Sequence, residues 1–250
     1  MQEGKYIYCI IATDEAKHFG PIGIGGRGDE VHNVCYGGLS AVISNTPLTR
    51  YELSKDTLLA HQRVVEQVME EYTVLPVRFC TVAESVKDII GLLQLRRNEF
   101  LGLIQDLDNK IEIGLKVYWK NMKNVFEELV QENSKLKEKG LVYSVLIKDE
   151  LLQLGKEVAK FLDQKREEEG DIWMSVLTRL AHQDKILSMR EDSMVLNAAF
   201  LMERIRQQEF DEKIELISGR NKNRYDVKYV GPTPPYNFVN MELHLGKVVD

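Results

Sequence analysis

A proline-rich stretch near the end of the chain, residues 231–238, most constrains how the chain can fold. It reads Gly231-Pro232-Thr233-Pro234-Pro235-Tyr236-Asn237-Phe238. Each proline fixes φ and removes a backbone donor, so we expect this stretch to exclude both a helix interior and a paired strand. Residues 224–230 alternate apolar or aromatic with charged side chains, which predicts a strand ending at Gly231. The prolines, Tyr236 and Phe238 then form a C-terminal clamp on a neighbouring surface; a ligand contact is the alternative.

The remaining sequence alternates between patterns typical of strands and of helices. The expected strands span residues 5–12, 31–36, 39–44, 74–79, 111–119 and 193–202. The expected helices span residues 55–71, 83–104, 121–139, 149–168 and 207–218, with another beginning at Asp171. Residues 141–147 fit either state. Gly170 predicts a turn, so that the helices on either side of it form an antiparallel hairpin.

These patterns predict an α+β protein with two packed domains. We expect a ferredoxin-like sheet with helices in residues 1–108. Residues 109–250 then form a second α+β domain that carries the long helical hairpin as an insertion at about 121–190.

Composition excludes several classes of protein. A formal net charge of −6 over 250 residues gives no electrostatic footprint for nucleic acid, and anionic membranes would repel such a surface. No run approaches the ~18 apolar residues of a membrane span, and the N-terminus does not resemble a signal peptide. Three cysteines without metal-ligand spacing suit a reducing compartment. We therefore expect a soluble cytoplasmic protein.

No motif predicts a cofactor. The glycine-rich residues 20–28 resemble a phosphate cradle, but strand-like residues follow them, so no helix N-terminus is available for phosphate. The histidines His32, His61, His182 and His244 are scattered, without the spacing of metal ligands. We therefore expect neither a metal nor a cofactor.

His61 and Cys80 invite comparison with a Cys-His nucleophile. His61 falls on the apolar face of its predicted helix, and Cys80 follows a phenylalanine in a segment that we expect to be buried. A reactive thiolate needs an electropositive and partly exposed setting, so a structural histidine is the favoured interpretation. Arg78 more plausibly pairs with a carboxylate, and Glu66, Glu84 and Glu112 are its candidates.

Four stretches in the right order resemble the gas vesicle accessory protein family of the F and L type. They are Tyr6-Ile7-Tyr8-Cys9-Ile10, Leu59-Ala60-His61-Gln62-Arg63-Val64-Val65-Glu66, Leu75-Pro76-Val77-Arg78-Phe79 and the clamp. The family usually has glycine where this chain has Cys80 and often tryptophan where it has Thr233. The motif residues, expected to be structural or to lie in an interface, are His61, Pro76, Arg78, Phe79, Glu112, Gly231, Pro232, Pro234, Pro235, Tyr236 and Phe238.

The resemblance implies a non-enzymatic accessory protein that associates with the hydrophobic shell protein of gas vesicles and with other accessory proteins during vesicle assembly. It also supports a ferredoxin-like N-terminal half. The rival hypothesis is a ferredoxin-like small-ligand binder or enzyme that uses His61, Arg78 and Glu112 in a cleft. A third is a scaffold that binds only accessory proteins and has no affinity for the shell protein.

Overall fold

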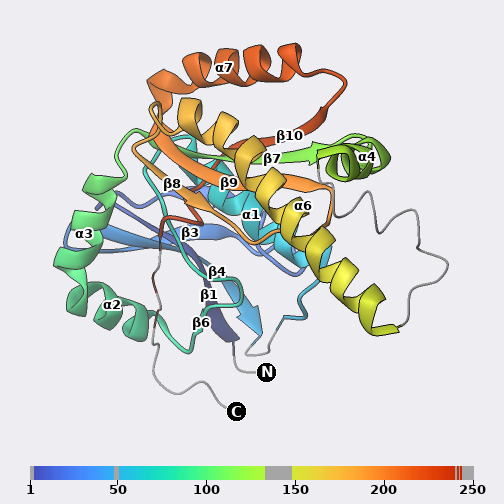
Figure 1. Cartoon of the computed structure of the whole chain (residues 1–250). Helices are drawn as coiled ribbons and strands as arrows, with labels where there is room; N and C mark the ends of the chain where they lie inside the picture. The colour runs from blue at the N-terminus through green and yellow to red at the C-terminus, as the bar shows by residue number, and fades with distance from the viewer. Residues whose placement is uncertain (1–2, 48–50, 133–147, 240, 242, 244–250) are drawn as a thin grey trace. The chain divides into compact units, whose positions relative to one another are not determined.

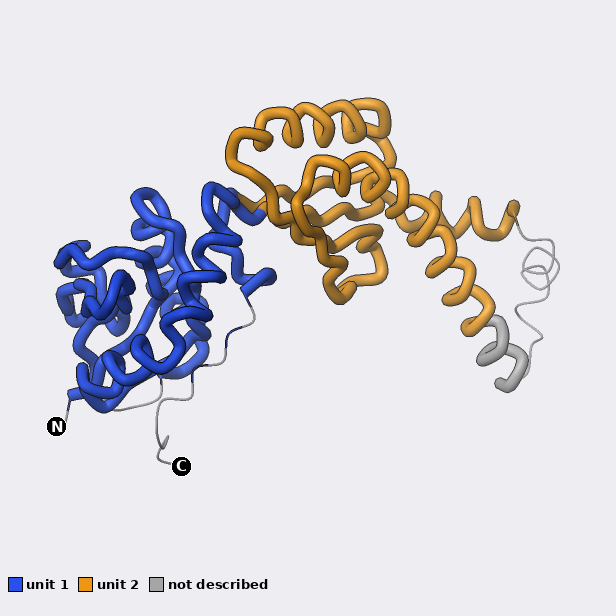
Figure 2. The backbone as a smooth tube through the Cα atoms, turned by 90° about the vertical axis from the view of Figure 1, so that its left-hand side faces the viewer, with its two compact units in different colours: residues 1–112, 232–250 blue, residues 113–231 orange. Residues whose placement is uncertain are grey.

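The computed structural model of the chain describes residues 3–47, 51–132, 148–239, 241 and 243, without the side chains of residues 148–154. The chain forms two compact units (Figure 2). Unit 1 comprises Met1–Glu112 and Pro232–Asp250, and unit 2 comprises Ile113–Gly231. The sequence predicted one boundary after residue 108, with residues 232–250 in the second domain. The structure groups this last segment with unit 1, because membership depends on contacts between residues far apart in the sequence.

Unit 1 is built on one antiparallel sheet (Figure 1). Its elements are β1 (Glu3–Ile11), β2 (His18–Gly20), β3 (Val31–Tyr36), β4 (Leu39–Pro47), α1 (Lys55–Met69), β5 (Leu75–Pro76), β6 (Val82–Ala83), α2 (Val86–Leu95) and α3 (Arg97–Asp106). The strand order is β2-β3-β4-β1-β5, and β6 also pairs with β1. The predicted central strand is confirmed, because residues 6–11 of β1 are fully buried. The β3–β4 hairpin is also confirmed, and its turn uses Gly37 and Gly38 at positive φ.

The strands β1 to β4 all precede α1, so the chain order in unit 1 is not the β-α-β-β-α-β order of a ferredoxin-like fold. The sequence predicted that fold for the N-terminal half. Glycines and a proline between residues 20 and 28 explain the difference, because they favour an irregular connection over a helix between β1 and β3.

Two segments of unit 1 differ from their predicted forms. The predicted helix over residues 83–104 is divided into α2 and α3 at Arg96, whose φ of −108° and ψ of 18° leave the helical region. The break lets each piece bury its own apolar residues, Ile89 and Leu93 in α2 and Phe100 in α3. The predicted strand over residues 74–79 is reduced to β5, because the chain bulges away from β1 between residues 77 and 81.

Unit 2 carries the ferredoxin-like arrangement. Its elements are β7 (Lys110–Trp119), α4 (Met122–Glu132), α6 (Lys148–Leu177), β8 (Gln183–Ile186), β9 (Met194–Glu203), the 3-10 turn η2 (Arg204–Arg206), α7 (Gln207–Arg220) and β10 (Tyr225–Thr233). The strand order is β10-β7-β9-β8. Numbered within the unit, the strands lie in the order 4-1-3-2, with helices after the first and third. The fold is therefore α+β, as predicted.

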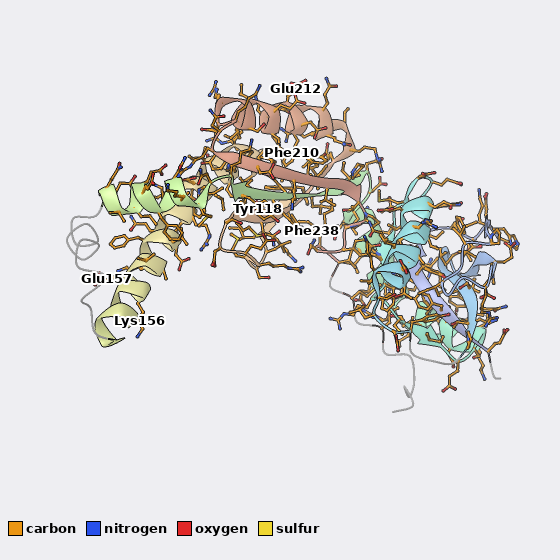
Figure 3. The ribbon with its side chains drawn as sticks, turned by 90° about the vertical axis from the view of Figure 1, so that its right-hand side faces the viewer. Tyr118, Lys156, Glu157, Phe210, Glu212 and Phe238 are labelled. Carbon is orange, nitrogen blue, oxygen red and sulfur yellow. The ribbon has the colours of Figure 1, made fainter. Side chains whose placement is uncertain are left out.

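Buried aromatic pairs hold the helices of unit 2 on its sheet. Phe210 of α7 faces the strands (Figure 3) and packs edge-on against Phe200 of β9, with ring centroids 5.1 Å apart. Trp173 of α6 packs in the same way against Tyr225 of β10 at 5.7 Å. The interior strand predicted over residues 193–202 is confirmed as β9, and the strand predicted over residues 111–119 lies in β7.

The turn predicted at Gly170 is wrong. Gly170 lies buried inside α6, which continues without a break from Lys148 to Leu177. Glycine lowers helix stability but does not stop a helix whose apolar face is buried on both sides of it, as Leu162 and Trp173 are here. The helices inserted after β7 are therefore α4 and α6. The end predicted for the first of them near Gly140, and residues 141–147, lie outside the described residues.

The final strand also runs further than predicted. β10 continues through Gly231 and Pro232 to Thr233, so Pro232 does not end it. The strand lies at the edge of its sheet, where a missing N–H can face away from the neighbouring strand. Among the residues that the structure describes, none of the helices combines the length and apolar character needed to cross a bilayer.

Candidate functional site

A buried polar pair lies at the centre of unit 1. His61 of α1 is 4% exposed, and its Nδ1 lies 3.0 Å from the hydroxyl of Tyr6 on β1. Phe79 packs edge-on against both rings, and Tyr8 stacks on the imidazole with centroids 5.7 Å apart. The imidazole is thus enclosed by aromatic rings, which explains why a polar residue sits on the apolar face of its helix.

The surrounding donors define the protonation of His61. The backbone N–H of Cys80 donates to the Tyr6 oxygen at 2.9 Å, so the Tyr6 O–H is oriented to donate to Nδ1. Burial lowers the pKa of His61 to about 4, and a backbone hydrogen bond with Val77 opposes this only in part. His61 is therefore neutral near pH 7, and its accepting nitrogen is already occupied by Tyr6. Burial likewise raises the pKa of the Tyr6 hydroxyl, which stays protonated.

Residues 77–81 form a bulge at the edge of the unit 1 sheet. Val77 N donates to Tyr8 O at 3.0 Å, and Ile7 N donates to Thr81 O at 2.9 Å, so Arg78, Phe79 and Cys80 are looped out between these two bonds. Pro76, before the bulge, is buried in β5. Arg78 lies exposed within the bulge, and its carbonyl accepts from the Thr81 hydroxyl at 2.7 Å.

Cys80 has a backbone φ of 66°, in the left-handed region that favours glycine. Its half-buried sulfur accepts a hydrogen bond from Tyr51 N at 3.4 Å. Nδ1 of His61 pairs with the Tyr6 hydroxyl rather than with the Cys80 thiol. A Cys-His nucleophile needs a base within hydrogen-bonding reach of the sulfur, and this geometry does not supply His61 in that role.

The glycine-rich connection is tied to the same core. Ile24 is fully buried, and its N–H donates to the Tyr8 hydroxyl at 2.7 Å. The same hydroxyl lies 2.8 Å from the Ser44 hydroxyl on β4. The element that follows the connection is strand β3, as predicted. Its glycines allow the chain to turn around Ile24, with Gly25, Gly26 and Gly28 at positive φ.

Glu112 and Asn237 join the start of β7 to the C-terminal segment within unit 1. Glu112 is 4% exposed, and its carboxylate accepts from Asn237 N at 2.8 Å and from the Asn237 side-chain amide. The hydroxyl of Thr233 donates to the Glu112 carbonyl at 3.3 Å. A buried carboxylate requires such donors, so these contacts fix the C-terminal clamp in place.

The clamp is buried through its prolines more than through its aromatic rings. Pro234 and Pro235 are buried, whereas Tyr236 is 36% exposed and Phe238 is half-buried. Gly231 and Pro232 are exposed at the end of β10. Burial of its hydroxyl, and after it the nearby Cys9 and Glu66, raise the pKa of Tyr236. The hydroxyl end of the ring therefore faces the protein.

The structure gives a setting for each of the three residues of the rival hypothesis. His61 pairs with Tyr6, Glu112 holds the clamp, and Arg78 is exposed in the bulge. The pairing predicted for Arg78 with Glu66, Glu84 or Glu112 stays a prediction. The described residues contain no group of three or more His, Cys, Asp or Glu side chains arranged to hold a metal ion. His244 lies outside them.

Sequence patterns do not indicate the partners that explain the motif residues. Tyr6 and Tyr8 were recognised only as strand residues, and Asn237 only as part of the clamp. Their positions in β1 and after the prolines gave a local signal of structure but none of pairing, because the side-chain partners His61, Ser44 and Glu112 lie 55, 36 and 125 positions away.

Unit 2 contains a second polar cluster that the sequence did not indicate. Glu169 of α6 pairs with the guanidinium of Arg224 and accepts from Trp119 Nε1 at 2.6 Å. Arg224 also donates to Glu128 of α4 at 2.5 Å, and Lys165 lies 3.2 Å from Glu128. The cluster connects α4, α6 and the ends of two strands, and it stabilises the packing of the helices.

Comparisons with known proteins agree across nearly the whole chain. The family model described as gas vesicle synthesis protein GvpL/GvpF matches residues 4–240. Gas vesicle protein F1 of Halobacterium salinarum is 26% identical over 249 residues, covering 98% of this chain and 96% of the relative. Gas vesicle protein L of Streptomyces sp. is 25% identical over 267 residues, covering 95% of this chain and 93% of the relative.

Solved structures share the fold. The crystal structure of the gas vesicle protein GvpF from Anabaena sp. PCC7120 superposes with a TM-score of 0.84 at 23% identity, covering 96% of this chain and 100% of that one. The crystal structure of GvpF from Microcystis aeruginosa superposes with a TM-score of 0.81 at 24% identity, covering 95% of this chain and 99% of that one. The chain therefore belongs to the gas vesicle synthesis protein GvpL/GvpF family of gas vesicle accessory proteins.

Proposed function

We propose that this protein is a non-enzymatic assembly factor of the cytoplasm that associates with gas vesicles. It binds their hydrophobic shell protein together with other accessory proteins and assists nucleation and growth of the vesicle. The family match over residues 4–240 carries this proposal. The names of the matching relatives refer to gas vesicles and to no reaction.

The buried polar groups of unit 1 support a binding role over a catalytic one. His61 is neutral and paired, and the Glu112 carboxylate is committed to the C-terminal clamp. A general base needs a free lone pair and access to substrate. Neither His61 nor Glu112 offers both, which favours the binding role over the catalytic one.

Exposed apolar side chains offer a surface for a hydrophobic partner. Leu53, just before α1, and Leu58 and Leu59, in its first half, are 74%, 42% and 45% exposed. A shell subunit presents apolar surface before it polymerises, and a protein that covers this surface suppresses its aggregation. We include these leucines, together with Tyr236 of the clamp, in the proposed contact with the shell protein.

The test is a titration of the purified chain with freshly solubilised shell protein, read by co-sedimentation. We expect saturable binding that keeps the shell protein in solution, with weaker binding by Leu59→Lys and Tyr236→Ala. Ile205→Lys is the matched control, because Ile205 is 87% exposed and lies in η2 of unit 2. Folded protein that shows no saturable binding at micromolar concentration contradicts the proposal. Retained binding to other accessory proteins then favours the scaffold hypothesis.

A further inference from the structure

Two histidines face one another across neighbouring strands at the edge of the unit 1 sheet. His18 of β2 and His32 of β3 are direct partners in the antiparallel register. Direct partners project from the same face of a sheet. Their ring centroids are accordingly 6.0 Å apart, and the rings are inclined by 31°. His18 is exposed and His32 is half-buried, so ions in solution reach the pair.

The backbone on both sides of His18 is fixed. Lys17 exchanges two hydrogen bonds with Asn33, because Lys17 N donates to Asn33 Oδ1 at 2.7 Å and Asn33 N donates to Lys17 O at 3.2 Å. The Asn33 side-chain amide also donates to Glu15 O at 2.8 Å. On the other side, Gln67 of α1 donates to Phe19 O at 3.0 Å.

These bonds hold the short edge strand against β3 at His18, and the register shifts beyond it, between His18 and Gly20. The distance between the two histidine backbones is therefore set before any ligand arrives. A preorganised pair of ligands binds an ion more tightly than two ligands that must first be ordered.

Neutral imidazoles are preferred ligands of zinc, copper and nickel. A shared ion lies about 2.0–2.1 Å from one nitrogen of each ring. The 6.0 Å between the ring centroids leaves room for one ion between the rings once a nitrogen of each ring points toward the other. Among the described residues, no third His, Cys, Asp or Glu side chain joins this pair in a metal-binding group. Water would therefore fill the remaining coordination positions of the ion.

We propose that His18 and His32 form a two-ligand site for a divalent transition-metal ion of the imidazole-preferring class. Binding joins the edge strand β2 to β3 and stabilises this part of the sheet. The site is independent of the proposed contact with the shell protein, and its ligands are 14 positions apart in the sequence.

The experiment is calorimetric titration of the tag-free full chain with NiCl2 at pH 7.5, repeated with ZnCl2. We expect one saturable site whose affinity falls by more than about tenfold in His18→Ala and in His32→Ala. Loss of a residue that supports a metal ligand lowers metal affinity by roughly 10–100-fold, and loss of a ligand itself should lower the affinity at least as much. His182→Ala is the matched control, because this exposed histidine lies in unit 2. It should bind nickel as the unchanged protein does.

Thermal unfolding provides the second measurement. Nickel should raise the Tm of the unchanged protein and of His182→Ala but not that of His18→Ala. The Tm without metal shows whether each variant is folded. If the half-buried His32 is needed for folding, His18→Ala decides the test, because His18 is exposed. Absence of saturable binding, or equal binding by His18→Ala and the unchanged protein, overturns the proposal.

Discussion

The hydroxyl of Tyr6 lies 3.0 Å from Nδ1 of His61, and both side chains are almost completely removed from solvent. The pair joins the central strand β1 to helix α1. It also positions the bulge at residues 77–81, because the same hydroxyl accepts from Cys80 N. Two motif stretches of the sequence, and the residue directly after a third, therefore meet at one hydrogen-bonded group.

The first prediction concerns the pH dependence of stability. The pKa of His61 is lowered by burial to about 4, below its ordinary value of about 6.5. The unfolded chain therefore binds more protons between these values, and the contribution of His61 is present above pH 6.5 and lost as pH falls toward 4. Between pH 7 and pH 4, we expect the free energy of unfolding of the unchanged protein to fall by roughly 3 kcal/mol more than that of His61→Gln. Urea unfolding at several pH values measures this, and a parallel decline in both proteins would contradict it.

The second prediction concerns Glu112. Replacing it with alanine leaves the Asn237 donors without the carboxylate that accepts from them, and we expect the free energy of unfolding to fall by about 2 kcal/mol. Glu84→Ala is the control, because Glu84 is exposed. Its effect should stay within about 0.5 kcal/mol. Denaturant unfolding gives both values. Equal stability of the two variants would show that the clamp does not depend on Glu112.

The third prediction distinguishes a helix interior from a turn at Gly170. Alanine has the higher helix propensity, and a β-carbon at this position would lie 3.5 Å from Val195 O, an ordinary contact. Gly170→Ala should therefore raise stability by about 0.5–1 kcal/mol. Gly231 has a φ of 142°, so Gly231→Ala should lower stability by about 1–2 kcal/mol. The two Tm shifts should have opposite signs, and destabilisation by Gly170→Ala would contradict the continuous helix.

The fourth prediction concerns the left-handed backbone at Cys80. Glycine removes the steric cost of this conformation but also removes the hydrogen bond from Tyr51 N to the sulfur. We expect Cys80→Gly to change stability by less than about 1 kcal/mol, whereas the branched Cys80→Val should lower it by about 1–2 kcal/mol. Thermal unfolding in reducing buffer compares them. A glycine variant less stable than the valine variant would be inconsistent with the strain.

The fifth prediction concerns the cluster around Glu169. Its side chain is 13% exposed and that of Arg224 is 23% exposed, so solvent screens their interaction only in part. Glu169→Gln should destabilise unit 2 by about 1–3 kcal/mol. Lys123→Ala removes the pair with Glu127, whose members are 83% and 57% exposed, and should change stability by less than about 0.5 kcal/mol. Chemical denaturation with helix content as the signal tests both, and similar effects would mean that the cluster contributes little.

The sequence predicted elements whose signal is local. The apolar residues 6–11 of β1 and the Gly37-Gly38 turn each lie within one short segment, and each was predicted correctly. The buried face of α1 was predicted in part, because His61, Val65 and Val68 are buried but Leu58 is 42% exposed. The α+β class follows from these patterns, and four motif stretches in order were enough to indicate the family.

Tertiary structure decided what depends on distant residues. Gly170 continues a helix because buried residues on both sides of it hold α6 in place, and Pro232 extends β10 because that strand lies at a sheet edge. His61 is neutral because Tyr6, Tyr8 and Phe79 surround it, and Glu112 is satisfied by Asn237, which follows it by 125 positions. Sequence patterns report which side chains prefer burial. Their partners are fixed only when strands pair and helices pack, because burial makes each polar group dependent on the donors that the fold brings to it.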